Sequence, residues 1–393
     1  MSANKLPLSN HFDFIFAGGG AAGLSLAAQI ASSPLKDRSI LIIDRDRKQN
    51  NDRTWCFWSQ SPTLFDSIAY RVWQQVEFIS PGFERIYPLN PYHYQMIRGI
   101  DFYQYTRQYL RQFPSIQFLN AHVDQITDGD QAAQVTAAGQ TYTADWVFNS
   151  LYLFDQIQPD PSRYHFLKQH FKGWEVETSQ DVFNPDLPRL FDFRVAQQDE
   201  MRFVYILPFS PRRALVEFTL FSANLLEDAQ YEAVLRDYTA KFLSLQNFSI
   251  NQVENGVIPM TDQPFARRAG QRVLNIGTRG GRVKPSSGYA FLRIQHDSAA
   301  ILQSMLQQGH PFHLPESPAR YRLFDSILLQ ILYRHGGLSQ SIFTALFKNN
   351  PIQRIFRFLD EEAPILENAA LMATLPTWPF LRALIKLKLL RRI

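Results

Sequence analysis

Three glycines and one aspartate near the N-terminus have the spacing of a dinucleotide-binding turn. Gly18, Gly20 and Gly23 fit Gly-x-Gly-x-x-Gly, a pattern that permits a tight turn and lets backbone approach a pyrophosphate. Asp44 ends the next predicted strand, about 20 residues further on, where a carboxylate can bind a ribose. The alternative is an ordinary strand-turn-helix with chance glycines. The residues assigned to this site are Gly18, Gly20, Ala21, Ala22, Gly23, Asp44 and Arg45.

A second glycine-bearing segment far downstream indicates which dinucleotide is bound. Val273–Ile276 is predicted as a strand, and Pro285–Gly288 as a turn that opens a helix over Tyr289–Met305. In many flavoproteins such a turn places the positive end of a helix dipole at the isoalloxazine ring. The two segments together therefore predict FAD, with a plain glycine loop as the alternative. The residues assigned to the flavin side are Gly277, Thr278, Pro285, Ser287, Gly288 and Tyr289. Thr278 stands where such proteins usually have an aspartate.

A single carboxylate, Glu217, interrupts the apolar stretch Leu215–Leu220. In apolar surroundings a carboxyl group is expected to have a raised pKa and to keep its proton, which is what a general acid requires. The alternative is that Glu217 lies on the solvent side of an alternating strand. Its neighbours at alternate positions, Leu215 and Thr219, do not decide between the two faces.

The elements around the first turn must bring these residues together. His11–Ala17 is predicted as a strand, Ala21–Ala31 as an alanine-rich helix and Ser39–Ile43 as a buried strand. This order begins a βαβ unit. Gly99–Phe113 is predicted as a helix and Ile116–Ile126 as one strand.

The predicted secondary structure of the rest of the chain changes twice. Residues 50–98 are aromatic and are predicted to be irregular because of three prolines. Gln134–Val147 is predicted as a hairpin. Phe171–Ile258 alternates like strands of an antiparallel sheet, interrupted by a helix over Glu227–Leu243, and the chain after Pro285 is mostly helical.

The predicted fold class is α/β, with a Rossmann-like FAD-binding domain of the glutathione-reductase or hydroxylase type. An antiparallel-sheet substrate domain is inserted into it, and a helical region follows. The FAD-binding domain is assigned residues 1–75, 99–155 and 263–305, the substrate domain residues 76–98 and 156–262, and the helical C-terminal region residues 306–393.

Composition excludes several classes of protein. The chain has 393 residues and a formal net charge of +4, which is too weak to indicate nucleic-acid binding. The single cysteine, Cys56, excludes an internal disulfide and any multi-cysteine metal site, and no metal ligand set is predicted. The first dozen residues are polar and do not resemble a signal peptide, so a cytoplasmic location is expected. No apolar run reaches the roughly 18 residues that a bilayer span requires.

The C-terminal segment combines apolar and cationic residues. No acid follows Glu367, whereas basic and apolar residues alternate from Trp378 to Arg392. This composition predicts an interfacial helix attracted to anionic lipid, and hence a peripheral membrane protein. The alternative is a terminal helix docked on the domain, because the apolar residues do not form a clean face.

Several separate segments resemble the FAD-linked lycopene cyclases of carotenoid synthesis. Asp52–Trp58 resembles the family's Asp-x-Thr-Trp-x-Phe-Trp element, and Val283–Phe291 is the most specific match. Phe171–Glu177, Glu254–Met260 and Arg357–Glu361 are similar to further family segments, in the same order along the chain.

The resemblance implies an enzyme that closes the ends of lycopene into rings without net redox change, with reduced FAD as cofactor and NAD(P)H as reductant. Glu217 is then the candidate acid. The family has a second acid at the next position, but here Phe218 replaces it, so one carboxyl must suffice or the flavin must take part. Trp55, Phe57 and Trp58 are the candidate substrate residues, because aromatic faces stabilise a cation. At least one of these rings could instead pack in the core.

Other functions remain open from the sequence. A flavin-dependent isoprenoid reductase, similar to geranylgeranyl reductases, is the first alternative. An aromatic hydroxylase is less compatible, because Phe148-Asn149-Ser150 and Gly277-Thr278 lack the Asp-Gly and Gly-Asp pairs of that class. A carotenoid or flavin carrier without activity is the last. The sequence does not indicate the oligomeric state, the ring type or whether one or both ends react.

Overall fold

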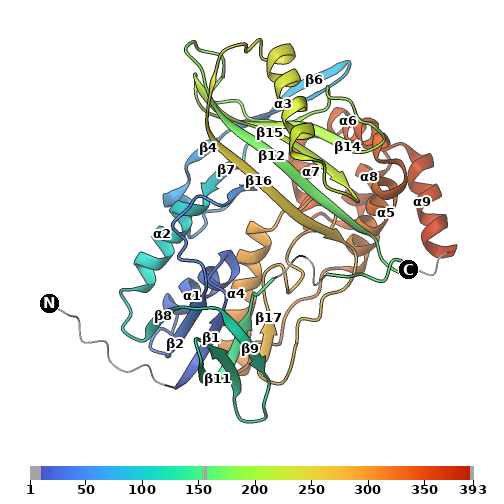
Figure 1. Ribbon diagram of the computed structural model, residues 1–393. Helices are drawn as coiled ribbons and strands as arrows, with labels where there is room; N and C mark the ends of the chain where they lie inside the picture. The colour runs from blue at the N-terminus through green and yellow to red at the C-terminus, as the bar shows by residue number, and fades with distance from the viewer. Residues whose placement is uncertain (1–9, 153, 155–156, 390–393) are drawn as a thin grey trace.

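The computed structural model describes residues 10–152, 154 and 157–389. It contains two large sheets, with the C-terminal helices beside the second (Figure 1). In Figure 1 the first sheet lies at the bottom, the second crosses the top and the C-terminal helices lie on the right. The Rossmann-like sheet, the antiparallel sheet and the helical C-terminal region predicted from the sequence are all present.

The first sheet is parallel at its centre. Its order is β8-β2-β1-β11, with β10 and β17 pairing with successive halves of β11 and β9 pairing with β10. The strands are β1 (His11–Ala17), β2 (Ile40–Asp44), β8 (Ile116–Asn120), β9 (Val123–Thr127), β10 (Ala133–Ala137), β11 (Gln140–Asn149) and β17 (Val273–Asn275). Helices α1 (Ala21–Ala31) and α4 (Phe291–Gln308) pack together on one face, where Gln295 donates to Ser25 Oγ over 2.8 Å. The predicted βαβ unit is confirmed.

The segment predicted as one strand, Ile116–Ile126, is two strands. β8 pairs in parallel with β2 at one edge of the sheet, whereas β9 pairs with β10 at the opposite edge. Asn120, the last residue of β8, donates from its side chain to the carbonyl oxygens of Asp44 and Arg45. A strand cannot continue across a sheet to its other edge, so the chain must leave it after Asn120.

The second sheet has the order β16-β12-β15-β14-β13-β5-β6. Its pairs are antiparallel except β13 with β5. The strands are β5 (Gln75–Ser80), β6 (Phe83–Pro88), β12 (Phe166–Glu177), β13 (Arg189–Asp192), β14 (Met201–Ser210), β15 (Arg213–Ser222) and β16 (Ser249–Thr261). Helix α3 (Asp228–Phe242) covers one face of the sheet through the core around Val216 and Leu235.

Residues 50–98, predicted to be irregular, are mostly strands. β3 (Thr54–Ser59) and β4 (Arg71–Trp73) flank β7 (His93–Arg98) in a small sheet, and β5 and β6 form a hairpin. The prediction was wrong because the prolines lie at turns and strand ends, with Pro88 the last residue of β6. These short strands are stabilised by pairing with other strands and by packing in the aromatic core. Local residue propensity does not predict either interaction. Helix α2 (Gly99–Leu110) follows β7.

Within the described residues, the C-terminal helices pack on the remaining face of the second sheet and on one another. They are α5 (Ala319–His335), α6 (Ser339–Asn349), α7 (Ile352–Leu359), α8 (Ile365–Met372) and α9 (Thr377–Leu389). Leu329, Phe347 and Phe356 of these helices share one core with Phe78 and Leu215 of the sheet. Among the described residues, no helix is both long and apolar enough to cross a bilayer.

Candidate active site

The predicted nucleotide turn has the close packing that its glycines allow. The Gly18 N–H donates to Ile43 O over 2.8 Å, so the turn begins at the carboxyl end of β1 beside β2. A Cβ atom at Gly23 would collide with Gly18 O, which explains why helix α1 can start so close to the strand. At Gly20 a Cβ would meet no atom of the described residues within 4 Å, so the helix N-terminus opens onto free space. Helix N-termini of this kind bind phosphate.

Asp44 lies beside this turn, as predicted. Its Oδ2 accepts a hydrogen bond from the Gly19 N–H over 2.7 Å. A small depression next to the carboxylate is lined by Gly19, Asp44, Arg107 and Phe118 among others, which fits an adenosine end. Arg45, assigned to the same site, is exposed and contributes only its carbonyl oxygen to Asn120.

The late glycine loop packs directly on the start of α1. Gly277 has a φ of +59°, and a Cβ there would lie 2.8 Å from Ala22 Cβ. Ile276 N–H donates to Asn149 O over 2.9 Å, which fixes the loop to the first sheet. Ala22 and Gly277, two residues assigned to FAD that are about 250 positions apart in the sequence, therefore lie in contact. Thr278, the next residue, lines the main cavity described below.

The turn before α4 closes through its own backbone. Gly288 N–H donates to Lys284 O, and Lys284 N–H donates to Tyr289 O, both over 2.9 Å. Ser287 Oγ is buried and has no hydrogen-bond partner among the described residues, so it can bind a polar group of a ligand. Helix α4 begins two residues later than predicted, at Phe291.

A buried ion cluster ties this turn to the C-terminal helices. The Lys284 ammonium lies 3.1 Å from Asp325 and 2.9 Å from Glu361. Arg293 of α4 pairs with the same Glu361 over 2.8 Å, and Ser286 Oγ donates to Asp325. The charges of Lys284 and Arg293 lower the pKa of Glu361 against the opposing effect of its burial, which is the largest one. Asp325 and Glu361 were given no role from the sequence, although Glu361 ends the quoted segment Arg357–Glu361, because their partners lie far away along the chain.

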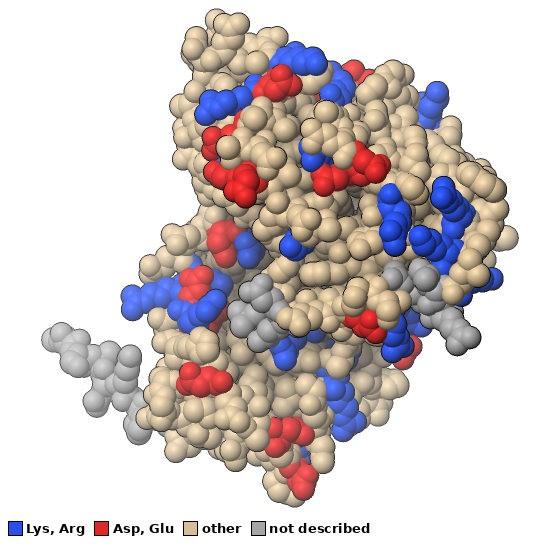
Figure 2. All heavy atoms as spheres, turned by 45° about the vertical axis from the view of Figure 1, so that its right-hand side comes forward, with Lys and Arg blue, Asp and Glu red and all other residues tan. Residues whose placement is uncertain are grey.

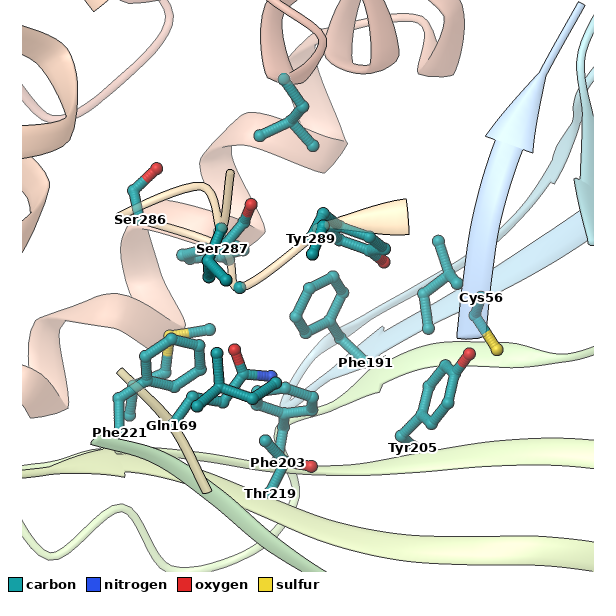
Figure 3. A pocket seen from close by; sticks show the side chains of 18 of the residues that line it. Cys56, Gln169, Phe191, Phe203, Tyr205, Thr219, Phe221, Ser286, Ser287 and Tyr289 are labelled. Atoms are coloured by element: carbon teal, nitrogen blue, oxygen red, sulfur yellow. The ribbon is translucent and has the colours of Figure 1, made fainter. Parts of the chain in front are cut away.

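A cavity of about 390 Å³ lies between the second sheet, this turn and the C-terminal helices. Figure 3 shows Phe203, Thr219 and Phe221 directed from the sheet toward Ser287 and Tyr289 of the turn. The lining is mainly aromatic and aliphatic. It includes Trp55, Trp58, Phe171, Phe191, Phe203, Leu215, Phe221, Ile258, Tyr289, Phe291, Phe343, Phe356, Phe358 and Phe380. Such a space suits an apolar small molecule.

Strand β15 directs Glu217 into this cavity. Leu215, Glu217 and Thr219 line the cavity, whereas Val216 and Phe218 pack in the core under α3. Burial raises the pKa of Glu217 to about 8, although Thr219 Oγ1 donates to Glu217 Oε1 over 2.7 Å and partly opposes the shift. At neutral pH this carboxyl therefore keeps its proton.

A second carboxyl group, which the sequence analysis did not assign, lies near Glu217. Glu254 of β16 lines the same cavity and accepts a hydrogen bond from Thr54 Oγ1 over 2.7 Å. Burial raises the pKa of Glu254, and its charge adds to the rise at Glu217. The expectation that one carboxyl must suffice or the flavin must take part, because Phe218 replaces the second acid, considered only the adjacent position, whereas the cavity holds a second carboxyl from another strand. The two carboxyls come from different strands, and only strand register brings them together.

The three aromatic residues assigned to the substrate lie on two sides of β3. Trp58 lines the cavity and stacks on Phe356 with a centroid distance of 4.3 Å. Trp55 also reaches the lining. Phe57 does not: it is 2% exposed and stacks on Phe291 at 4.9 Å within the core of the first domain. Asp360, which lies within the quoted segment Arg357–Glu361 but was given no role from the sequence, accepts a hydrogen bond from Trp58 Nε1 over 2.6 Å and thereby orients that ring.

A group of neutral polar residues completes the sheet side of the cavity. Tyr94 and Tyr205 share a hydrogen bond of 2.5 Å between their hydroxyls, and Figure 3 shows Cys56 beside Tyr205. Burial raises the pKa of the Cys56 thiol to about 12. Cys56 is therefore a thiol rather than a thiolate, and it is not an activated nucleophile.

The two sheets, the glycine turn and the helical region define a Rossmann-like α/β class that solved flavin-dependent proteins share. A geranylgeranyl bacteriochlorophyll reductase-like protein from Thermoplasma acidophilum matches with a TM-score of 0.57 at 11% identity, over 97% of this chain and 99% of that one. A flavin-dependent brominase matches with a TM-score of 0.60 at 12% identity, over 89% and 94%. At these identities the likeness shows the fold alone.

Sequence similarity then defines the family. The family model for the lycopene cyclase protein matches residues 13–385, so the chain belongs to the lycopene cyclase family. A lycopene beta-cyclase from a Paracoccus species is 30% identical over 167 residues, and the match covers 40% of this chain and less than half, 42%, of that protein. A lycopene beta-cyclase from Pantoea ananas is 24% identical over 297 residues, covering 72% of this chain and 71% of that one.

Proposed function

We propose that the protein is a lycopene beta-cyclase, which closes the ends of lycopene into β-ionone rings to give γ- and β-carotene. The observation that carries this proposal is Glu217, a carboxyl that keeps its proton at neutral pH and faces an aromatic cavity beside the glycine turn. An acid in an apolar space can protonate an alkene, whereas the same acid in water would lose its proton to the solvent. The proposal agrees with the names of the two relatives.

Each ring closure adds one proton and removes another. Glu217 donates a proton to a terminal double bond of lycopene, and the resulting tertiary carbocation is attacked by the neighbouring double bond. A second proton then leaves from the new ring, and no electrons are gained or lost overall. The mainly apolar lining of the cavity disfavours water, which would trap the cation. Trp55 and Trp58 offer the negative faces of their rings to it.

The residues present fit FAD. The open helix N-terminus at Gly20 fits a pyrophosphate, Asp44 fits a ribose, and the unpartnered Ser287 hydroxyl lies at the turn assigned to the flavin. The cofactor set proposed is Gly18, Gly20, Ala21, Ala22, Gly23, Asp44 and Arg45 with Gly277, Thr278, Pro285, Ser287, Gly288 and Tyr289. When bound in its reduced form, FAD supplies negative charge that can stabilise the carbocation, with NAD(P)H as the proposed reductant.

The substrate is proposed to enter from a membrane surface. Met372 of α8 and Phe380 of α9 line the cavity from within. On the outside of the same helices, Leu366 is 84% exposed and Trp378 71% exposed. Figure 2 shows Lys and Arg side chains gathered on the face that carries the C-terminal helices. A cytoplasmic protein that lies on anionic lipid through this face could take an insoluble polyene directly from the bilayer.

Helix α9, which forms most of the C-terminal segment predicted to bind lipid, packs on α5 with one side and is exposed on the other. Ala383 and Leu387 of α9 pack against Ile327 and Ile331 of α5, as expected for a docked helix, while Ile385 remains 50% exposed on the outer side. The predicted tail residues Leu390, Arg391 and Arg392 lie outside the described residues. Packing against α5 therefore leaves part of the apolar surface of α9 exposed.

The function is tested by anaerobic incubation of the purified protein with lycopene in liposomes and chemically reduced FAD. The expected product has the mass of lycopene and one or two β-rings. An isoprenoid reductase would instead give a product whose mass rises by added hydrogens. Incubation with oxidised FAD is the control and should give no product. A protein that takes up no FAD would contradict the proposal at its first step.

A further inference from the structure

Four adjacent strands of the second sheet place one row of residues side by side. Gly173 of β12 pairs with Glu217 of β15 on one side and with Glu254 of β16 on the other. Beyond Glu217, β14 contributes Tyr205 to the same row. Directly opposite residues of neighbouring strands point to the same face of a sheet. The row therefore brings two carboxyl side chains onto one wall of the cavity with only a glycine between them.

The glycine leaves room for the two carboxyl groups to approach each other. A Cβ at Gly173 would lie 3.3 Å from Glu217 Cβ and 3.4 Å from Glu217 Cγ, so the Glu217 side chain already lies against this position. Neighbouring strands are about 4.8 Å apart, which separates the backbones of Glu217 and Glu254 by about 10 Å. Two extended glutamate side chains can bridge much of that distance.

The two carboxyl groups have different surroundings, and these favour the protonated form of Glu217 and the ionised form of Glu254. Glu217 has Thr219 as its hydroxyl donor and lies between Leu215 and Phe221 on the cavity face of β15. Glu254 accepts a hydrogen bond from Thr54, and the neighbouring cationic Arg53 also lines the cavity. Hydrogen bonds and a nearby cation favour the ionised form, whereas two charges this close disfavour double ionisation. One proton is therefore shared unequally, with Glu217 the protonated member.

We propose that Glu254 is the catalytic base of this site, forming with Glu217 a carboxyl pair that holds a single proton. The inference rests on the proposed cyclisation. Glu217 gives its proton to the terminal alkene carbon, and the new ring bond forms from the neighbouring double bond. The C–H bond next to the ring cation then breaks, its electrons become the ring double bond and its proton goes to Glu254. Transfer of that proton from Glu254 to Glu217 restores the starting state, so protons and electrons balance.

Other titratable and charged groups lie around the same cavity, including Asp325 of α5 and Asp360 behind Trp58. Asp52 and Arg53 precede β3, Cys56 lies on β3, Tyr94 on β7, Tyr205 on β14 and Tyr289 in the turn before α4. Burial raises the pKa of the Cys56 thiol and of all three phenols, so they stay neutral across the working pH range. Asp360, which accepts the hydrogen bond from Trp58 Nε1 at the cavity wall, also has its pKa raised by burial, to about 7. A titration seen near neutral pH is therefore assigned to the carboxyl pair only where Glu254→Gln moves it.

The test is the variant Glu254→Gln, which keeps the size of the side chain and removes its basicity. Cyclisation is expected to fall by about 100-fold or more, the usual loss when a general base is removed. FAD binding, followed by flavin fluorescence, is expected to match wild type. Glu177→Gln is the matched control, because Glu177 ends β12 on the exposed surface and pairs with Asn251. Wild-type cyclisation by Glu254→Gln would overturn the inference.

Infrared spectroscopy of the protonated carboxyl gives a second readout that needs no turnover. The charge of Glu254 raises the pKa of Glu217, so removing that charge is expected to lower the pH at which the Glu217 carbonyl band disappears. An unchanged midpoint in Glu254→Gln would show that the two groups do not interact and would overturn the pair. If wild type and Glu177→Gln do not cyclise lycopene with reduced FAD, the proposed function fails and the base assignment fails with it. If both cyclise and Glu254→Gln does too, only the inference fails.

Discussion

Replacing Glu217 by glutamine keeps the shape of the side chain but removes its ability to ionise. In the unfolded chain Glu217 ionises near its ordinary pKa of 4.5, whereas in the folded protein it keeps its proton up to about pH 8. Because the folded pKa is raised, unfolding releases a proton between these two pH values. The stability that wild type has below pH 4.5 is therefore lost progressively as the pH rises through this window.

The magnitude follows from the size of the shift. Each pH unit inside the window costs wild type about 1.4 kcal/mol, which gives roughly 3 kcal/mol at pH 7 and no further loss above pH 8. Glutamine does not suffer this loss, so Glu217→Gln is expected to unfold at a higher urea concentration than wild type at pH 7, and at about the same concentration at pH 4. Cyclisation should fall by about 100-fold or more, because the proton donor is gone.

The assay is urea unfolding at a series of pH values, followed by both tryptophan fluorescence and circular dichroism so that coincident transitions justify a single free energy. Glu177→Gln, an exposed change of the same type, should show no pH-dependent difference from wild type. A Glu217→Gln variant with the pH dependence of wild type would refute the buried, protonated carboxyl. A variant that cyclises lycopene at the wild-type rate would refute its role as the acid.

Three other variants test separate parts of the account. Gly277→Ala is expected to weaken FAD binding about tenfold or more, because its Cβ would meet Ala22. FAD binding is measured by flavin fluorescence. The control is Gly82→Ala, which has similar backbone strain but open space around it and should bind FAD normally. Lys284→Met leaves Asp325 as a buried charge without its cation and leaves Glu361 with Arg293 alone, and is expected to lower the free energy of unfolding by about 3 to 5 kcal/mol. The exposed control Lys348→Met should change it little. Replacing both Leu366 and Trp378 by serine is expected to reduce co-sedimentation with anionic liposomes several-fold, whereas Leu64→Ser, at a residue 51% exposed elsewhere, should not. If the Leu366/Trp378 double variant and Leu64→Ser co-sediment equally with anionic liposomes, the proposed membrane face is contradicted.

The sequence predicted best those parts that local pattern determines. The strand His11–Ala17 and the helix Ala21–Ala31 have the predicted bounds, because the glycine turn and the buried run before it leave few alternatives. The helix after the late loop was also found, within two residues of its start. In contrast, the strands within residues 50–98 form through pairing with one another and, for β5, with β13, and that pairing was not recognised from the sequence.

A site residue could be predicted where its type and its immediate sequence neighbours indicated a role. Glu217 was identifiable as a carboxyl in an apolar strand, although its face became certain only once α3 was seen to cover the other side. Glu254 was quoted as part of a family segment but had no predicted role, because its relation to Glu217 depends on the register of β12 between their strands. Trp58 and Phe57 are adjacent in sequence, yet β3 is buried on both faces, so composition alone could not tell the cavity wall from the core.

The central claim is that a polyene end is protonated in this cavity without transfer of electrons. It is tested most directly by one turnover in D₂O, with protein and reduced FAD in excess over lycopene, followed by mass spectrometry of the product. The account predicts one deuterium for each ring formed and no other change in composition. A product without deuterium, or one that has gained a pair of hydrogens at a double bond, would contradict it.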